Sequence, residues 1–308
     1  MNADGRFAPS PTGELHLGNL RTALLAWLFA RSQGARFLVR VEDLDEGRVR
    51  ERYVTQQLED LRAIGLDWDE PPVRQSERKQ LYAEALERLE RDGLTYPCFC
   101  SRREIREAAS AQHGEDAELV YPGTCARLAP SEARRRVEAG EQHALRLRAE
   151  GAVVTASDRL HGEVTRTVDD IVLVRRDGAF AYNLAVVVDD AAQGIGEIVR
   201  GDDLLSSTPR QALLYDLLGY ERPTWAHVPL VIGPDGQRLA KRHGAVTLRD
   251  LAAKGLSPAQ VAARLARSLG LAEPGEEPTP VELLARFDPA SLPREAWVLP
   301  DEWRATRC

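Results

Sequence analysis

The stretch RFAPSPTGELHLGNL (residues 6–20) decides how the chain is interpreted, together with RLAKR at residues 238–242. In the first stretch, a turn rich in proline and glycine leads into a helical pattern at HLGN, His16–Asn19. Backbone N–H groups at a helix start attract anions, and Gly13 and Gly18 would let a nucleotide lie against the main chain. The second stretch places three cations within five residues on a glycine-rich loop. The two stretches therefore predict one ATP site built from distant parts of the chain.

The composition is that of an ordinary globular protein. The chain has 308 residues, 43% of them hydrophobic and 29% charged, which allows about two domains of 100–200 residues. No apolar run approaches the roughly 20 residues that span a bilayer. The opening MNADGRFAPSP is not an apolar signal segment. We therefore expect a cytoplasmic protein without membrane contact.

The charge argues mildly against a dedicated nucleic-acid binder. The net charge is −7, whereas such binders are usually basic. A local basic stripe can still bind nucleic acid on an acidic protein. Only three of the 41 basic residues are lysines, namely Lys79, Lys241 and Lys254. One of these rare lysines lies in the RLAKR stretch.

The first third of the chain predicts alternating strands and helices. Residues 20–34 have helical apolar spacing and end at a glycine, and residues 35–45 read as a strand with acidic residues at its end. Residues 49–66 and 76–93 both read as amphipathic helices. This alternation indicates a parallel sheet with crossover helices, whose ligands bind beyond the carboxyl ends of the strands.

The later segments continue this pattern after an interruption. Residues 143–167 carry strand patterns, and the segment from Ala181 to Gly201 predicts a return to the parallel sheet. Within that segment we interpret the VVV run as a strand and place Asp189 and Asp190 at its end, where they would organise Mg²⁺ or Arg200, or be solvated. Residues 246–270 read as helical.

The motifs resemble those of class I aminoacyl-tRNA synthetases. HLGN resembles the HIGH signature and RLAKR the KMSKS signature, and RVEDLDEGR (residues 40–48) and IVRGDDLLSSTPRQ (residues 198–211) resemble the glutamyl branch. Asn19 replaces the last histidine of HIGH, and Ala240 replaces the serine of KMSKS. The chain is similar throughout to the short paralogues of glutamyl-tRNA synthetase.

The resemblance implies an α/β fold: a Rossmann-like parallel sheet with an inserted zinc-containing domain and a small C-terminal helical region. Residues 1–94 and 181–245 would form the two halves of the catalytic domain. Residues 95–180 would form the inserted connective domain, and residues 246–308 the helical region. These last residues are too few for the anticodon-reading domain of the longer enzymes. We expect a monomer, because no long heptad pattern appears.

Amino-acid activation requires positive groups around ATP. A carboxylate attacks the α-phosphate and expels pyrophosphate, so the protein mainly positions the reactants and neutralises charge. His16 and Lys241 suit the catalytic role. The resemblance places ATP, with Mg²⁺, on His16, Gly18, Asn19, Arg238 and Lys241.

Recognition of L-glutamate requires cations for two carboxylates and an acceptor for the ammonium group. By resemblance, Glu42 meets the ammonium group, and the other residues that line the substrate are Arg6, Ala8, Ser10, Tyr182 and Arg200. Arginine suits a bidentate grip on carboxylate. The pattern leaves open which arginine meets which carboxylate. Taken singly, Glu42 and Arg200 would read as surface ion pairs.

A second constellation is formed by CFC, with Cys98 and Cys100, and YPGTC, with Cys125. Zinc favours thiolates in tetrahedral sites, so these cysteines predict a structural zinc ion. The short paralogues use a tyrosine as fourth ligand, which points to Tyr121. His113 is the chemically more usual alternative. Buried cysteines without a metal remain the other interpretation.

The leading functional hypothesis is an enzyme that activates L-glutamate with ATP and transfers it to queuosine at the wobble position of tRNA(Asp). This acceptor is implied by the resemblance alone. The first alternative is a minimal glutamyl-tRNA synthetase that charges tRNA(Glu). A non-catalytic tRNA-binding paralogue is kept open by Asn19 and Ala240. An unrelated nucleotidyltransferase would explain the N-terminal motif but not RGDDLLSSTPRQ.

Overall fold

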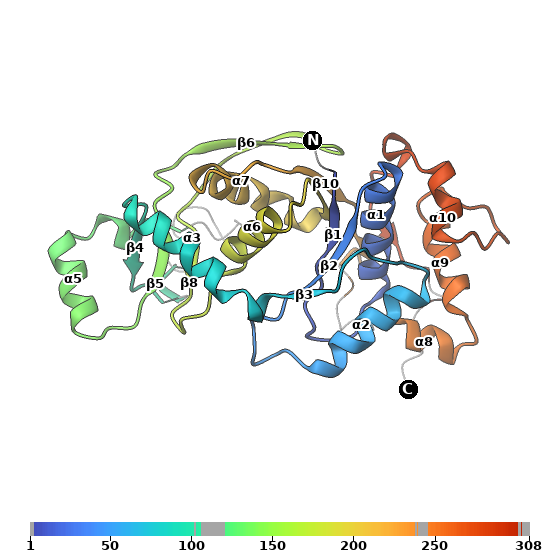
Figure 1. Ribbon diagram of the computed structural model, residues 1–308, viewed down its shortest axis with the longest axis horizontal. Coiled ribbons are helices and arrows are strands. Elements are labelled where there is room, and N and C mark those ends of the chain that lie inside the picture. Colours follow the sequence, from blue (N-terminus) through green and yellow to red (C-terminus); the bar gives the residue numbers. More distant parts are fainter. Residues whose placement is uncertain are drawn as a thin grey trace.

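A seven-stranded sheet forms the centre of the computed structural model (Figure 1), which describes residues 3–101, 103–105, 121–237, 239, 246–300 and 303. The strand order is β3-β2-β1-β9-β10-β6-β7, and every neighbouring pair is parallel except the β6–β7 hairpin. The strands are β1 (Gly5–Phe7), β2 (Phe37–Val41), β3 (Val73–Arg74), β6 (Val153–Asp158), β7 (Gly162–Thr167), β9 (Glu197–Gly201) and β10 (Thr224–Val228). The predicted α/β fold with a mostly parallel sheet is confirmed.

The two faces of this sheet pack against different sets of helices. On one face, alternate residues such as Val39 and Val199 join a core with α1 (Leu17–Ser32). On the other face, Leu38 and Ile198 join a separate core. Its helices are α3 (Lys79–Arg91), α6 (Tyr182–Ala192) and α7 (Thr208–Leu217). Burial on both faces explains why the central strands read as continuous apolar runs.

The remaining helices flank these cores. They are α2 (Glu51–Ala63), α5 (Pro130–Glu138), α8 (Leu248–Ala253), α9 (Pro258–Arg267) and α10 (Pro280–Leu283). Helices α9 and α10 lie against α1, on the right in Figure 1. Within the ranges that the structure describes, no helix is long and apolar enough to cross a membrane.

The segment predicted as a strand around VVV is a helix instead. Val186, Val187 and Val188 lie inside α6, and all three are buried. The helix packs between the sheet and the helices α3 and α7, so its apolar residues need no amphipathic spacing. A short apolar run cannot be assigned to strand or helix by periodicity alone. Within residues 181–201 the strand is β9, which follows α6.

A smaller antiparallel sheet lies apart from the central one. Its order is β4-β5-β8, formed by β4 (Thr95–Cys98), β5 (Ala144–Leu147) and β8 (Val172–Val174). In Figure 1 it stands beside α5, at the end of the molecule far from α9 and α10. Strands β6 and β7 come from the same stretch of chain but extend the central sheet, where Asp158 pairs with Trp225 of β10. Finally, β11 (Val231–Ile232) and β12 (Trp297–Val298) form a short parallel pair.

The burial pattern of α3 predicts a stability difference between two of its residues. Leu89 is fully buried in the core below α6, whereas Glu87 on the same helix is exposed. We expect Leu89→Ala to lower the free energy of unfolding by about 3 kcal/mol, because it leaves a cavity. Glu87→Ala should change it by less than about 0.5 kcal/mol. Urea unfolding followed by circular dichroism measures both, and equal effects would contradict the described packing.

Candidate active site and metal centre

The first signature lies against the residues that follow the second. The N–H of Leu17 donates to the carbonyl of Val246 at 3.0 Å, and His16 forms an antiparallel bridge with Thr247. Arg238, Ala240 and Lys241 lie outside the described residues. The structure thus brings together two segments that are more than 200 residues apart in the sequence.

His16 caps the start of α1 in a defined orientation. The N–H of Asn19 donates to His16 Nδ1 at 3.3 Å, and the His16 N–H donates to Asn19 Oδ1 at 3.2 Å. Since Nδ1 accepts, a neutral imidazole carries its proton on Nε2. A Cβ atom on Gly18 would come within 3.0 Å of the His16 ring. The hydrogen bonds of Asn19 therefore fix the orientation of the imidazole, and Gly18 leaves the room that the ring needs.

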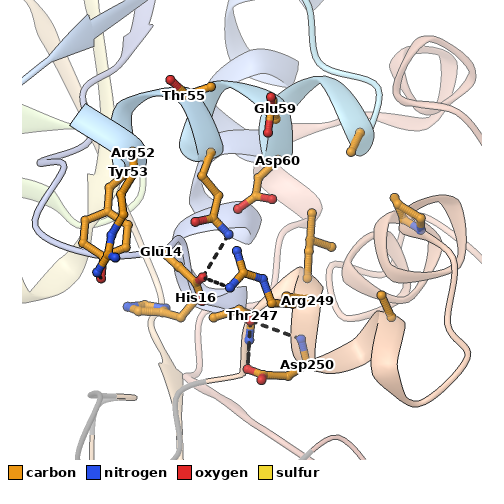
Figure 2. Close-up of a pocket in the computed structure, with 15 residues that line it drawn as sticks. Glu14, His16, Arg52, Tyr53, Thr55, Glu59, Asp60, Thr247, Arg249 and Asp250 are labelled. Carbon is orange, nitrogen blue, oxygen red and sulfur yellow. Dashed lines mark hydrogen bonds and ion pairs between the residues drawn. The ribbon is translucent and has the colours of Figure 1, made fainter. Parts of the chain in front are cut away.

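A broad cavity of about 1170 Å³ opens beside His16, between α2 and α8 (Figure 2). Glu14 joins its walls: its Oε1 accepts from Gln56 at 2.9 Å and pairs with Arg249 at 3.0 Å. Burial and the Glu14 charge raise the pKa of Asp60 to about 6. The lining holds four carboxylates, from Glu14, Glu59, Asp60 and Asp250, and two guanidinium groups, from Arg52 and Arg249.

A carboxylate joins two buried arginines on the opposite side of the sheet. Asp190 accepts from Arg6 Nε at 3.1 Å and from Arg40 Nη1 at 2.6 Å. All three side chains are nearly inaccessible to solvent. Burial alone would raise the pKa of Asp190, but the Arg40 and Arg6 guanidinium groups hold it below its usual range. Arg6 is thereby fixed at the carboxyl half of β1.

Asp189 serves different partners and corrects the sequence interpretation. Its carboxylate accepts from Arg78 Nε at 2.6 Å, Tyr82 Oη at 2.7 Å and Gln75 Nε2 at 2.8 Å. Asp189 and Asp190 are not solvated, because both lie buried in the last turns of α6. Among the described residues neither forms a hydrogen bond or ion pair with Arg200, but the charge of Asp190 counteracts the lowering of the Arg200 pKa. The interpretation of the two residues as solvated acids at a strand end is wrong.

Several predicted glutamate residues line one cavity. Ser10, Glu42 and Tyr182 border a space of about 630 Å³. Glu42 accepts from Arg40 Nη2 at 3.3 Å, and burial raises its pKa. Arg6 and Ala8 are not among the residues that line this space, although the charge of Arg6 acts on Glu42 and Tyr182. The space continues past Arg175, Arg176 and Arg146 to Cys100 at the smaller sheet.

Arg200 differs from the other buried arginines in its partners. Its guanidinium donates to Gln211 Oε1 at 2.7 Å, Thr208 Oγ1 at 2.9 Å and His227 Nε2 at 2.9 Å. No carboxylate lies within ion-pair distance of it among the described residues. Burial lowers its pKa. A buried cation held by neutral acceptors is suited to binding an anion.

The sequence interpretation missed the residues that hold these arginines. Arg40, Asp158 and His227 were not singled out, although all three are buried. One signal was available: Arg40 is a charged residue inside the apolar strand FLVRV. A charge at such a position requires a buried partner. The sequence could not identify the partner as Asp190, 150 residues away.

The predicted cysteine cluster is present. The sulfur atoms of Cys98, Cys100 and Cys125 all lie within 4.8 Å of one another. The Tyr121 hydroxyl lies 3.4 Å from Cys98 Sγ and 3.8 Å from Cys100 Sγ. Burial and the Cys125 sulfur raise the pKa of Cys100 to about 12. His113, the alternative fourth ligand, lies outside the described residues.

This donor set fits a metal ion. Three thiols and one hydroxyl converge from β4 and from the segment after residue 120. A bound cation would deprotonate the thiols that otherwise crowd one another. The ring of Tyr121 is also covered by the Arg146 guanidinium at 3.8 Å.

Comparison with known proteins agrees with this geometry. The family model described as tRNA synthetases class I (E and Q), catalytic domain, matches residues 3–279. A glutamyl-Q tRNA(Asp) synthetase of Nocardia farcinica is 61% identical over 96% of this chain and 93% of its own length. A glutamate–tRNA ligase of Coprothermobacter proteolyticus is 39% identical over 93% of this chain but 63% of its own length.

The fold of the chain is also found in a solved structure. A glutamate-tRNA synthetase from Elizabethkingia anophelis superimposes with a TM-score of 0.84 at 27% identity, covering 98% of this chain and 69% of that one. The chain therefore belongs to the glutamyl and glutaminyl (E and Q) group of the class I tRNA synthetases and is a ligase of that family.

Proposed function

We propose that the chain activates L-glutamate with ATP and transfers it to queuosine at the wobble position of tRNA(Asp). The observation that carries the glutamate part is Arg200, a buried cation held by neutral acceptors near the cavity of Glu42 and Tyr182. The acceptor part is supported by relatives called glutamyl-Q tRNA(Asp) synthetase, which this chain matches over nearly their whole length.

We assign Arg6 and Arg200 different roles in recognising glutamate. The charge of Arg6 is already engaged by Asp190, whereas the charge of Arg200 has no carboxylate beside it in the described part of the chain. We therefore assign a substrate carboxylate to Arg200. Glu42 takes the ammonium group, and the remaining contacts come from Arg6, Ala8, Ser10 and Tyr182. Where the carboxylate at Arg200 is that of the glutamate side chain, glutamine would leave Arg200 unpaired and be rejected.

ATP is proposed to lie where the two signatures meet. The glutamate α-carboxylate attacks the α-phosphate, and pyrophosphate leaves. His16 donates from Nε2 to a phosphate oxygen, since its Nδ1 is occupied by the helix cap. Lys241 neutralises developing charge, and Gly18, Asn19 and Arg238 border the nucleotide. Class I synthetases use ATP with Mg²⁺, whose charge would supplement these donors.

A structural zinc ion is proposed for the cysteine cluster. Cys98, Cys100 and Cys125 supply thiolates, and Tyr121 supplies the fourth ligand, because its hydroxyl is already beside two of the sulfurs. Four protein ligands leave no position for a catalytic water. The ion would tie β4 to the segment that follows residue 120. We keep residues 95–180 as the proposed connective domain on this basis.

Experiment can distinguish the proposed function from two alternatives. A minimal glutamyl-tRNA synthetase would use the same activation site, and the similarity to glutamate–tRNA ligases favours it. A non-catalytic tRNA-binding paralogue would have no need of the Arg200 arrangement.

The acceptor is tested by transfer of labelled glutamate. We expect labelling of purified tRNA(Asp) that contains queuosine, and none of tRNA(Asp) without it or of tRNA(Glu). Charging of tRNA(Glu) would favour the minimal synthetase. If no tRNA is labelled and no glutamate-dependent pyrophosphate exchange occurs, the enzyme proposal fails.

The activation site is tested by two lysine variants. Lys241→Ala should lower the rate of glutamate-dependent pyrophosphate exchange by about 100-fold, because it removes a charge that stabilises the transition state. Lys254→Ala, just after α8, should leave the rate within about twofold. Equal rates for the two variants would remove Lys241 from the site. Thermal unfolding serves as the control for the fold.

Measuring the zinc content of the purified protein tests the proposed metal site. We expect about one zinc ion per chain, and its loss in Cys125→Ser, because zinc requires the full set of thiolates. Cys308→Ser is the matched control and should retain the ion. Comparison of Tyr121→Phe with His113→Ala then decides the fourth ligand: only the true ligand's variant should bind zinc more weakly. Wild-type protein with far less than one zinc would end the proposal.

A further inference from the structure

The support of Arg200 is a chain of buried hydrogen bonds that crosses three strands. Arg200 Nε on β9 donates to His227 Nε2 on β10 at 2.9 Å. His227 Nδ1 lies 2.6 Å from Asp158 Oδ2 on β6. Arg200 and His227 are direct register partners in the parallel ladder, so both side chains leave the same face of the sheet. That face also carries Arg6, by register with Leu38.

The partners of His227 define its tautomer. Asp158 is a carboxylate, so Nδ1 must be the donor in their contact. Arg200 can only donate, so Nε2 must accept. Asp158 is itself held by the backbone N–H groups of Leu160, His161 and His227 at 2.8–3.0 Å. Burial raises the pKa of Asp158, but the hydrogen bond from the His227 side chain and those from the Leu160 and His161 N–H groups hold it below its usual range.

We infer that His227 is a positioning residue for glutamate recognition: as the neutral Nδ1–H tautomer fixed by Asp158, it aims Arg200 at the substrate carboxylate without neutralising it. A carboxylate in the place of the imidazole would form an ion pair with Arg200 and consume the charge that the substrate needs. A side chain without an acceptor would leave Arg200 Nε buried and unpaired. The inference rests on the proposed role of Arg200.

Acid should disrupt this arrangement. A protonated His227 donates from both nitrogens, so Nε2–H would oppose the Nε–H of Arg200 and add a second positive charge beside it. Burial lowers the pKa of His227 below its ordinary value of 6.5, so the neutral form prevails at pH 7. The neutral His227 side chain stabilises the fold fully above its ordinary pKa of 6.5. This stabilisation is lost as the pH falls through the lowered pKa that His227 has in the folded protein.

Other charged groups face the same region and must be separated from His227. His161 reaches the backbone carbonyl of His227 with its Nε2 at 3.1 Å. Thr208 lies 3.1 Å from His227 Nε2 but does not titrate. Across the cavity, Glu42 has a raised pKa and would lose its hold on the ammonium group in acid. The test therefore compares the wild type with variants that lack only the titration of His227.

Two substitutions of His227 each keep one of the two hydrogen bonds of the imidazole and remove the other. His227→Gln places an amide oxygen near the Nε2 position, where it accepts from Arg200, and Asp158 keeps its backbone donors. His227→Asn preserves a donor to Asp158 but offers no acceptor to Arg200. At pH 7.5 we expect His227→Asn to raise the glutamate Kd, measured by calorimetry without ATP, by about tenfold. His227→Gln should stay within about threefold.

The dependence on pH gives a readout that a merely structural role would not move. Between pH 7.5 and 5.5 the wild-type Kd should rise more steeply than that of His227→Gln, because only the wild type loses its acceptor. In pyrophosphate exchange at pH 7.5, His227→Asn should raise the KM for glutamate and leave kcat within about threefold. Parallel pH profiles for the wild type and His227→Gln, or equal Kd values for His227→Asn and His227→Gln, would overturn the inference. The wild-type profile and His227→Gln keep the test valid if His227→Asn does not fold.

Arg200→Lys separates this inference from the proposed function. Lysine loses the planar fork, so glutamate binding should weaken strongly. If Arg200→Lys binds glutamate like the wild type, the assignment of Arg200 fails, and the role of His227 fails with it. If Arg200→Lys is weak but His227→Asn is not, only the inference about His227 is wrong.

Discussion

The carboxylate of Asp190 is the constraint on which the glutamate side of the molecule depends. It accepts from Arg6 on β1 and from Arg40 on β2, in a region that water does not reach. Removing one partner of such a buried pair costs about 3–5 kcal/mol, because an uncompensated charge remains. Asp190 belongs to α6, so this helix can pack on the sheet only in the register that brings its last turns over the two strands.

Charge balance explains how the same region becomes a binding site. Arg40 is surrounded by Asp189, Asp190 and Glu42, and Arg78 is matched by Asp189. Arg200 lies one strand beyond Arg6 in the sheet and has neutral acceptors instead. The fold therefore neutralises Arg40 and Arg78, whereas the charge of Arg200 remains available for the glutamate carboxylate that we propose it binds. Its hydrogen bonds keep the geometry fixed while the charge stays available.

The sequence predicts those parts of this arrangement that depend on local chemistry. HLGN and Gly34 predict the start and end of α1, and the spacing of Cys98, Cys100 and Cys125 predicts a cluster that the structure contains. The contact of Arg40 with Asp190 joins residues 150 positions apart, and that of His227 with Asp158 joins residues 69 positions apart. No local rule gives such pairs. The α6 error has the same origin, because its valines face cores supplied by distant segments.

In the described part of the chain, the first signature is joined to the residues that follow the second mainly through the backbone. An ion pair joins Glu14 to Arg249, but the arginine side chain is 70% exposed, and exposed pairs contribute about 0–1 kcal/mol. The hydrogen bond from Leu17 to Val246 and the bridge of His16 with Thr247 do not depend on a mobile side chain. Thr247 also caps α8 through Asp250, so the start of this helix is tied to the start of α1. Substitution of Arg249 should therefore disturb the ATP site less than a change in the backbone at Val246 or Thr247.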